Sequence, residues 1–253
     1  MIRQLILGLA ITATPILGGC ATQTATTEDL PAGMPATPLA STPDLVPHTA
    51  NVKHHPDLGI LVFEFSVQGQ AGATTPDPAG QLDGAPVLGY VFPTNLNSED
   101  VGFGEVEGIV ALAITSHPDF DDTPLFDENF NRDYADDGAI WHPHWVVLNL
   151  DDRVPGGLSV KQFTTDDVVT LPPTNPGMPM YMDSPGFPVT NKGNTLRVVV
   201  PTYRVSNKVS FNYDAVACYM QVNASDSQRP MLGVYEVYGV LSGDLSLPYT
   251  VDE

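Results

Sequence analysis

Residues 139–150 read AIWHPHWVVLNL, and the alternation in this stretch decides the fold class. Side chains in a β-strand point to opposite faces with a period of two. His142 and His144 therefore share one face, while Trp141 and Trp145, which are both tryptophans of the chain, share the other. An apolar face rich in tryptophan must pack against other structure. The segment thus predicts a strand whose histidine face looks into a second cavity or cleft.

Other apolar segments of the chain are also short and rich in β-branched residues, and clusters of Gly, Pro, Asn and Asp separate them. This pattern is typical of strands joined by turns. The predicted strands are 58–67, 86–92, 108–115, 139–150, 158–163, 168–171, 196–205, 209–222 and 232–241. Within the eighth of these segments, residues 213–220 fit a strand or a helix.

The composition limits the amount of helix. The chain has 24 prolines and 22 glycines, which leave little room for long helices. One short helix is predicted after Asn97 and Ser98, where Glu99 and Asp100 supply acids to the first turn. We therefore predict an all-β domain with long loops and little helix. Two architectures are possible for this domain, a β-sandwich of two packed antiparallel sheets or a distorted barrel.

The His-Pro-His strand carries candidate ligands for a transition metal. Imidazoles two residues apart on a strand lie about 6–7 Å apart at their Cα atoms, so both rings can converge on one cation. His117 follows the predicted strand 108–115 and is the first choice of third ligand, with Asp119 and Glu64 as reserve carboxylates. Pro143 cannot donate to a ladder, so we expect an edge or a bulge that exposes the site to solvent. The alternative is that the histidines are structural and hydrogen-bonded in a cleft.

Zinc and copper are equal candidates for that metal. His-x-His pairs on β scaffolds resemble the metal sites of cupins and carbonic anhydrases, although no other part of those patterns occurs here. Met178, Met180 and Met182 lie in PGMPMYMDSPG and resemble the methionine motifs of periplasmic copper-handling proteins, in which thioether sulfur favours Cu(I). The alternative is a hydrophobic loop that covers the core. No histidine closely follows Cys218, which disfavours a blue-copper site.

An acidic segment, 119–138, connects His117 with His142 and reads DFDDTPLFDENFNRDYADDG. Calcium prefers carboxylate and amide oxygens, which recur here at every second position. The candidate calcium ligands are Asp127, Asn129, Asn131, Asp133 and Asp137. The alternation resembles the start of an EF-hand loop and departs from it at Arg132 and Gly138, where that loop has Gly and Glu. The alternative is a solvated acidic turn.

The charge balance excludes one class of partner. Among 253 residues, 10 are Lys or Arg and 30 are Asp or Glu, which gives a net charge of −20. Scattered cations in that number cannot form the basic patch that nucleic-acid binding requires. The hydrophobic fraction of 42% is enough for a packed core and too high for a disordered chain. The sequence contains no G-x-S-x-G, P-loop or H-E-x-x-H motif.

The first 20 residues, MIRQLILGLAITATPILGGC, predict a secretion signal, because Arg3 precedes a short apolar stretch. The run Leu17-Gly18-Gly19-Cys20 resembles the lipobox of bacterial lipoproteins. The resemblance implies that the signal peptide, residues 1–19, is removed and that Cys20 is lipidated. Position 21 is Ala rather than Asp, which in that family favours the outer membrane over the inner one.

The rest of the chain is expected to form a tether and one domain. Residues 21–47 are mainly Ala, Thr and Pro, which predicts a flexible tether. The lipidated cysteine and this tether would together occupy 20–47. A single β-rich domain would occupy 48–253. The expected location is the bacterial cell envelope, with the membrane as partner through the lipid anchor and no protein partner indicated. Cys218 would then lack an intramolecular partner and is expected to be buried and inert.

The sequence supports three functions. The first is a lipid-anchored envelope protein whose β domain binds zinc or copper through His142, His144 and His117. The second is a metal-dependent enzyme at the same site, with Asp119 as the nearby base. The third is a non-catalytic interaction or structural module that calcium stabilises, in which the histidines are merely packed.

Overall fold

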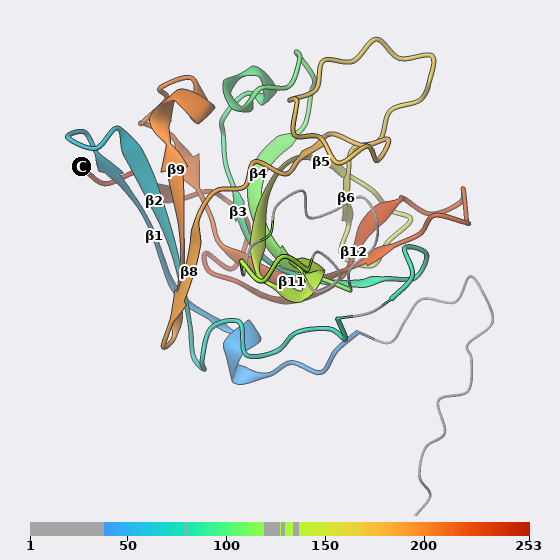
Figure 1. Cartoon of the computed structure of the whole chain (residues 1–253), viewed down its shortest axis with the longest axis horizontal. Coiled ribbons are helices and arrows are strands. Elements are labelled where there is room, and N and C mark those ends of the chain that lie inside the picture. The colour runs from blue at the N-terminus through green and yellow to red at the C-terminus, as the bar shows by residue number, and fades with distance from the viewer. Residues whose placement is uncertain (1–37, 79, 119–126, 128–129, 134–136) are drawn as a thin grey trace, which may run out of the picture. The chain divides into compact units, whose positions relative to one another are not determined.

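The computed structural model describes residues 38–78, 80–118, 127, 130–133 and 137–253. This part of the chain is all-β, as predicted (Figure 1). Its strands are β1 (Pro47–His55), β2 (Ile60–Val67), β3 (Pro86–Pro93), β4 (Ile109–Ser116), β5 (His142–Leu150), β6 (Leu158–Val160), β7 (Met182–Asp183), β8 (Val189–Lys192), β9 (Thr195–Pro201), β10 (Asn212–Tyr213), β11 (Val216–Val222), β12 (Leu232–Val240) and β13 (Tyr249–Thr250). Helix within the described ranges is confined to the short 3-10 turns η1 (Pro43–Leu45), η2 (Ser98–Val101), η3 (Asp137–Ala139) and η4 (Thr202–Val205).

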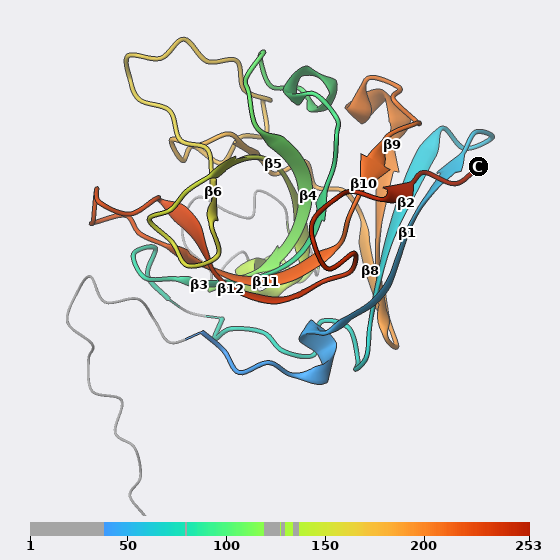
Figure 2. The same ribbon diagram turned by 180° about the vertical axis from the view of Figure 1, so that it is seen from behind.

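Six antiparallel strands close into a barrel, seen end-on in Figure 1 and from behind in Figure 2. Neighbouring strands follow the order β4-β3-β11-β12-β6-β5, and β5 pairs back onto β4. The short strand β7 pairs with the middle of β5, through Trp145 and Val146, where β6 does not reach. Closure pairs the strand edges of the ring with one another instead of leaving them open to other chains.

A second antiparallel sheet, in the order β1-β2-β9-β8, packs against the outside of the barrel wall. Phe63 of β2 meets Phe92 of β3 and Trp145 of β5 edge to face, with ring centroids 5.3 and 6.2 Å away. Such aromatic pairs add about 0.5–1.5 kcal/mol each beyond the area that they bury. Both predicted alternatives therefore occur together, since a barrel and an outer sheet share one packed core.

Residues along each barrel strand face this outer core and the lumen in turn. On β5, Trp145 and Val147 belong to the outer core, whereas Val146 and Leu148 belong to the lumen cluster. The predicted two-faced strand is therefore confirmed. The lumen cluster is apolar, and its members include Val87, Val91, Ala111, Ala113, Val160, Cys218, Met220, Val222, Leu232 and Val234.

Most of the predicted strands are present, with shifts of a few residues at their ends. Residues 168–171 are an exception, because they form no strand and the Val168 side chain is fully exposed. Residues 213–220 are extended rather than helical, and the predicted helix after Ser98 is the 3-10 turn η2. The sequence pattern does not predict β1, β7, β8 or β13, since β1 is largely polar and the others have two to four residues.

Packing begins a few residues ahead of position 48, the predicted start of the domain. Leu45 is fully buried, and the Asp44 carboxylate accepts a hydrogen bond from the Thr74 N–H at 2.9 Å. The predicted signal peptide (1–19), Cys20 and the tether up to residue 37 lie outside the described residues. In the described part of the chain, no helix has the length and apolar character that crossing a membrane requires.

The aromatic contact between the outer sheet and the barrel should contribute strongly to stability. Phe63 is fully buried, so Phe63→Ala is expected to lower the free energy of unfolding by about 3–5 kcal/mol through the cavity that it leaves. Urea unfolding followed by circular dichroism measures this change. The control Leu58→Ala, at an exposed position, should alter it by less than about 0.5 kcal/mol. A loss below about 1 kcal/mol for Phe63→Ala would contradict the described packing.

Candidate metal centre

The pairing of β4 with β5 brings three histidines to one end of the barrel. Thr115 lies opposite His142 in the register of the two strands. His117 follows Thr115 by two residues, and its backbone N–H donates to Gly138 O at 2.9 Å. His144 lies two residue pairs further along the same ladder, opposite Ala113. The prediction that His117 neighbours the His-Pro-His strand is therefore confirmed.

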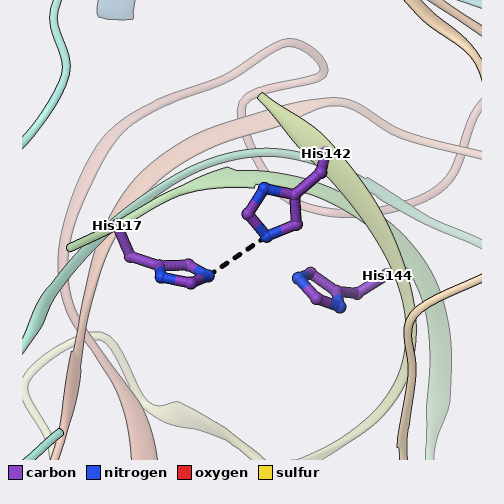
Figure 3. A group of neighbouring side chains, drawn as sticks. All are labelled: His117, His142 and His144. Carbon is purple, nitrogen blue, oxygen red and sulfur yellow. Dashed lines mark hydrogen bonds between the residues drawn. The ribbon is translucent and has the colours of Figure 1, made fainter. Parts of the chain in front are cut away.

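The three imidazoles converge on the lumen side of the wall, as Figure 3 shows. One ligand nitrogen from each of His117, His142 and His144 lies within 4.8 Å of the other two. The ring centroids are between 4.8 and 6.5 Å apart. All three side chains are buried, at 3%, 1% and 2% exposure respectively. The histidines thus lie close enough together to hold a metal ion.

Backbone carbonyl groups hold two of the rings through their Nδ1 atoms. His117 Nδ1–H donates to Pro118 O at 2.8 Å, and His142 Nδ1–H donates to Ile140 O at 2.6 Å. A carbonyl oxygen only accepts, so the proton of each neutral ring must be on Nδ1. The Nε2 lone pairs then point to the centre of the group, which is how metal-ligating histidines are commonly oriented.

His117 Nε2 and His142 Nε2 lie only 3.1 Å apart (dashed line in Figure 3). With both ring protons on Nδ1, two lone pairs face each other, and a proton between them would create a buried imidazolium. Burial opposes that charge: it lowers the pKa of His117 to about 4, that of His144 to about 3, and that of His142 well below its ordinary value. A metal cation binds neutral imidazole nitrogens and relieves the same repulsion.

The short strand β7 holds His144 from the opposite side. His144 Nδ1 lies 3.3 Å from Asp183 O and 3.1 Å from Ser184 Oγ. The Asp183 carboxylate is anchored in turn, because it accepts a hydrogen bond from Thr174 and forms an ion pair with Arg204 at 3.3 Å. Sequence reasoning missed Asp183 and Ser184, and a strand of two residues offers no alternation that could have revealed them.

The expectation that the site is open to solvent is wrong, because all three imidazoles are buried. The reasoning about Pro143 is nevertheless partly right. β5 pairs with β4 at Pro143 through Ile114, whereas its pairing with β7 on the other side begins at Trp145. Val147, four residues after Pro143, donates its N–H to Tyr181 O on the β7 side of the strand. Backbone nitrogens four residues apart on a strand point to the same side, so the nitrogen of Pro143 also faces the β7 side. Pro143 has no N–H to donate, and at its position β5 does not yet pair with β7, so the proline costs this ladder no hydrogen bond.

The structure tests one of the two reserve carboxylates. Asp119 lies outside the described residues. Glu64 is on β2 in the outer sheet, where it forms an ion pair with Arg197, so its assignment as a reserve ligand is wrong. Of the described residues, the histidines alone form a cluster of His, Cys, Asp or Glu that could hold a metal.

The sulfur-containing side chains near the site are part of the lumen core. Met178, Met180 and Met182 are all buried members of the lumen cluster, which fits the hydrophobic alternative for this run. Cys218 is also buried in the lumen, and burial raises the pKa of its thiol to about 12. Its burial and its raised pKa agree with the predicted inert cysteine.

The predicted calcium loop is described only in part, because Asn129 lies outside the described residues. The Asp127 carboxylate accepts from the N–H groups of Asn131 and Arg132 at 3.1 and 2.9 Å, one on each oxygen. Asn131 Oδ1 accepts from the Asp133 N–H at 2.7 Å, so these oxygens stabilise a tight turn. Asp137 is buried within η3. The calcium site stays a prediction.

The geometry defines a class of site, a buried three-histidine centre inside an antiparallel barrel. Comparison with known proteins adds no relative: no family model, no curated protein and no solved structure matches the chain. Its function must therefore be inferred from the chemistry of its own residues.

Buried neutral imidazoles should make the metal-free protein sensitive to acid. Their folded-state pKa values lie below 6.5, at about 4 for His117 and about 3 for His144, so the unfolded chain binds more protons in that interval. Stability should therefore fall as the pH decreases from about 6.5 to about 4, with up to about 1.4 kcal/mol per pH unit for each histidine. Urea unfolding across this range, with a chelator present, measures the slope.

A variant isolates the contribution of one ring. His144→Asn should reduce the slope by about one proton, because one fewer group takes up a proton on unfolding. His48→Asn, on β1 at an exposed position, is the matched control and should leave the slope at its wild-type value. An unchanged slope in His144→Asn would show that this ring is not held neutral.

Proposed function

We propose that this protein binds a zinc or copper ion through His117, His142 and His144. The observation that carries the proposal is the distance of 3.1 Å between His117 Nε2 and His142 Nε2. In both rings the Nδ1 proton is donated to a backbone carbonyl oxygen, so the two Nε2 atoms face each other with lone pairs. Zinc and copper both bind imidazole nitrogen, and they bind it in the neutral form that burial favours here.

The size of the group supports a transition metal. Bonds of about 2.0–2.1 Å at tetrahedral angles place two ligand nitrogens about 3.3–3.4 Å apart. The observed separation of His117 Nε2 and His142 Nε2, 3.1 Å, is close to that value. The nitrogen of His144 is within 4.8 Å of both, so small ring rotations would complete the set. Three protein ligands leave one position of a tetrahedral ion for another ligand.

Binding or sensing is favoured over turnover. In many hydrolytic metal centres a carboxylate or histidine beside the metal acts as general base toward the bound water. Among the described residues, the metal-binding group consists of histidines alone. The Asp183 carboxylate, on the strand that supports His144, is already engaged by Thr174 and Arg204.

We further propose that the protein is anchored in the bacterial cell envelope, with the outer membrane favoured. The support is the run Leu17-Gly18-Gly19-Cys20 at the end of an apolar signal segment. Removal of residues 1–19 and acylation of Cys20 would make anchoring effectively permanent. The Ala/Thr/Pro tether would then hold the metal-binding domain off the lipid surface.

Metal content tests the proposed centre. The purified protein, stripped with a chelator and then given zinc or copper, should retain about one ion per chain after gel filtration, as measured by elemental analysis. The double variant His142→Asn/His144→Asn should retain less than about a tenth of that amount, because two ligands are lost.

The matched control is His48→Asn/His54→Asn, which replaces two histidines of β1 and should keep the full content. A wild-type protein without stoichiometric zinc or copper would refute the site. Equal metal content in wild type and His142→Asn/His144→Asn would place the ion elsewhere.

Acylation can be followed separately. In a bacterial host given labelled palmitate, the wild-type chain should become labelled and sediment with membranes, whereas Cys20→Ala should do neither, because the thioether requires that cysteine. Cys218→Ala is the matched control and should behave as wild type, since that thiol is buried in the lumen. Label on the Cys20→Ala chain would contradict the anchor.

A further inference from the structure

An apolar cavity of about 70 Å³ extends along the barrel lumen and ends at the histidine centre. His144 and Thr115 form its inner end, and Thr115 Oγ1 lies 3.5 Å from His142 Nε2. Every strand of the ring contributes an apolar side chain to the wall: Val91, Ala113, Val146, Val160, Val216 and Val234. The cavity therefore brings apolar space up to His144, one of the three proposed ligands.

The outer end of this cavity meets a second pocket of about 280 Å³ at the opposite end of the barrel. The two spaces share the lining residues Pro93, Leu148, Leu158 and Leu245. Asn95 and Asn97 add polar groups to the outer pocket. Along β5, the distance from His144 at the inner end to Leu148 at the outer end is about 13 Å of extended strand. The lumen thus links a partly polar outer pocket with the buried histidines.

We propose that the lumen binds a linear aliphatic carboxylate. Its carboxylate occupies the fourth position of the metal, and its chain lies along the cavity toward the outer pocket. The inference rests on the proposed metal site, and it adds the class of ligand that the site accepts.

The charge of the centre favours an anionic head group. A divalent ion on three neutral imidazoles keeps its full charge inside a wall of apolar side chains, which is unfavourable without a counter-charge. The described part of the metal-binding group supplies no carboxylate. A carboxylate from a ligand would lower the net charge and complete four-fold coordination.

The dimensions of the cavity favour an aliphatic chain. The cavity volume of about 70 Å³ is spread along the lumen from His144 to Leu148, about 13 Å of strand, so its cross-section is narrow and suits an extended chain better than a ring. Gly89 of β3 helps to keep the space open, because a Cβ at that position would lie 2.8 Å from Met220 Cε. Each methylene that enters the lumen should strengthen binding about fourfold.

Cobalt(II) loaded into the purified protein provides the readout, since its d–d absorption changes when a ligand joins the metal. Titrations with acetate, hexanoate and octanoate should shift this spectrum with affinities that rise with chain length. Octanoate should bind at least about a hundredfold more tightly than acetate, because its added methylenes are buried. Octanoate that binds no more tightly than acetate, or leaves the spectrum unchanged, overturns the proposal, and this comparison needs no variant.

A lumen-filling variant adds a second test. Val91→Phe should weaken octanoate binding at least about tenfold while acetate still binds. Val168→Phe is the matched control, because that side chain is fully exposed. Equal octanoate affinity in Val91→Phe and wild type overturns the placement of the chain in the lumen. A protein that takes up no cobalt overturns the metal site itself, so the two failures are distinguishable.

Discussion

The pairing of β4 with β5 is the interaction on which the rest of the structure depends. Its hydrogen bonds close the ring of six strands. The same register sets Thr115 opposite His142 and so brings His117 to the His-Pro-His strand. Barrel closure and the histidine centre are therefore products of one ladder. A slip of one residue would turn every side chain of β5 to the other face, with Trp145 in the lumen and His144 in the outer core.

Burial gives the histidines their chemical character. The lumen removes water from the rings, and in the case of His142 and His144 a neighbouring histidine opposes a further charge, so their pKa values fall. Carbonyl oxygens of Pro118 and Ile140 take the Nδ1 protons. The neutral rings therefore turn nitrogen lone pairs toward the centre of the group, and apolar side chains surround them. A bound cation would meet that condition, and its own charge would in turn favour an anionic ligand in the remaining position.

β5 serves the outer core and the lumen at the same time. Trp145 packs against Phe63 of the outer sheet, while Val146 and its lumen-facing neighbours line the cavity. The strand that carries two of the histidines is thus fixed by aromatic packing on its back and by β4 along one side. β7 supports it on the other side, where Asp183 O contacts His144. Rigid support of this kind keeps ligand atoms in place before a metal arrives.

Local sequence determined that 139–150 is a two-faced strand with His142 and His144 on one side, because side-chain direction along a strand is a property of its own backbone. It also identified the strand that precedes His117. It could not show that the site is enclosed, because enclosure needs all six strands of the ring, and their pairing joins segments far apart in the chain. Nor could it identify the support from Asp183, which contacts His144 across 39 residues. Burial and long-range contacts arise only when the chain closes on itself, so tertiary structure alone decided that these imidazoles are neutral, buried and next to an apolar cavity.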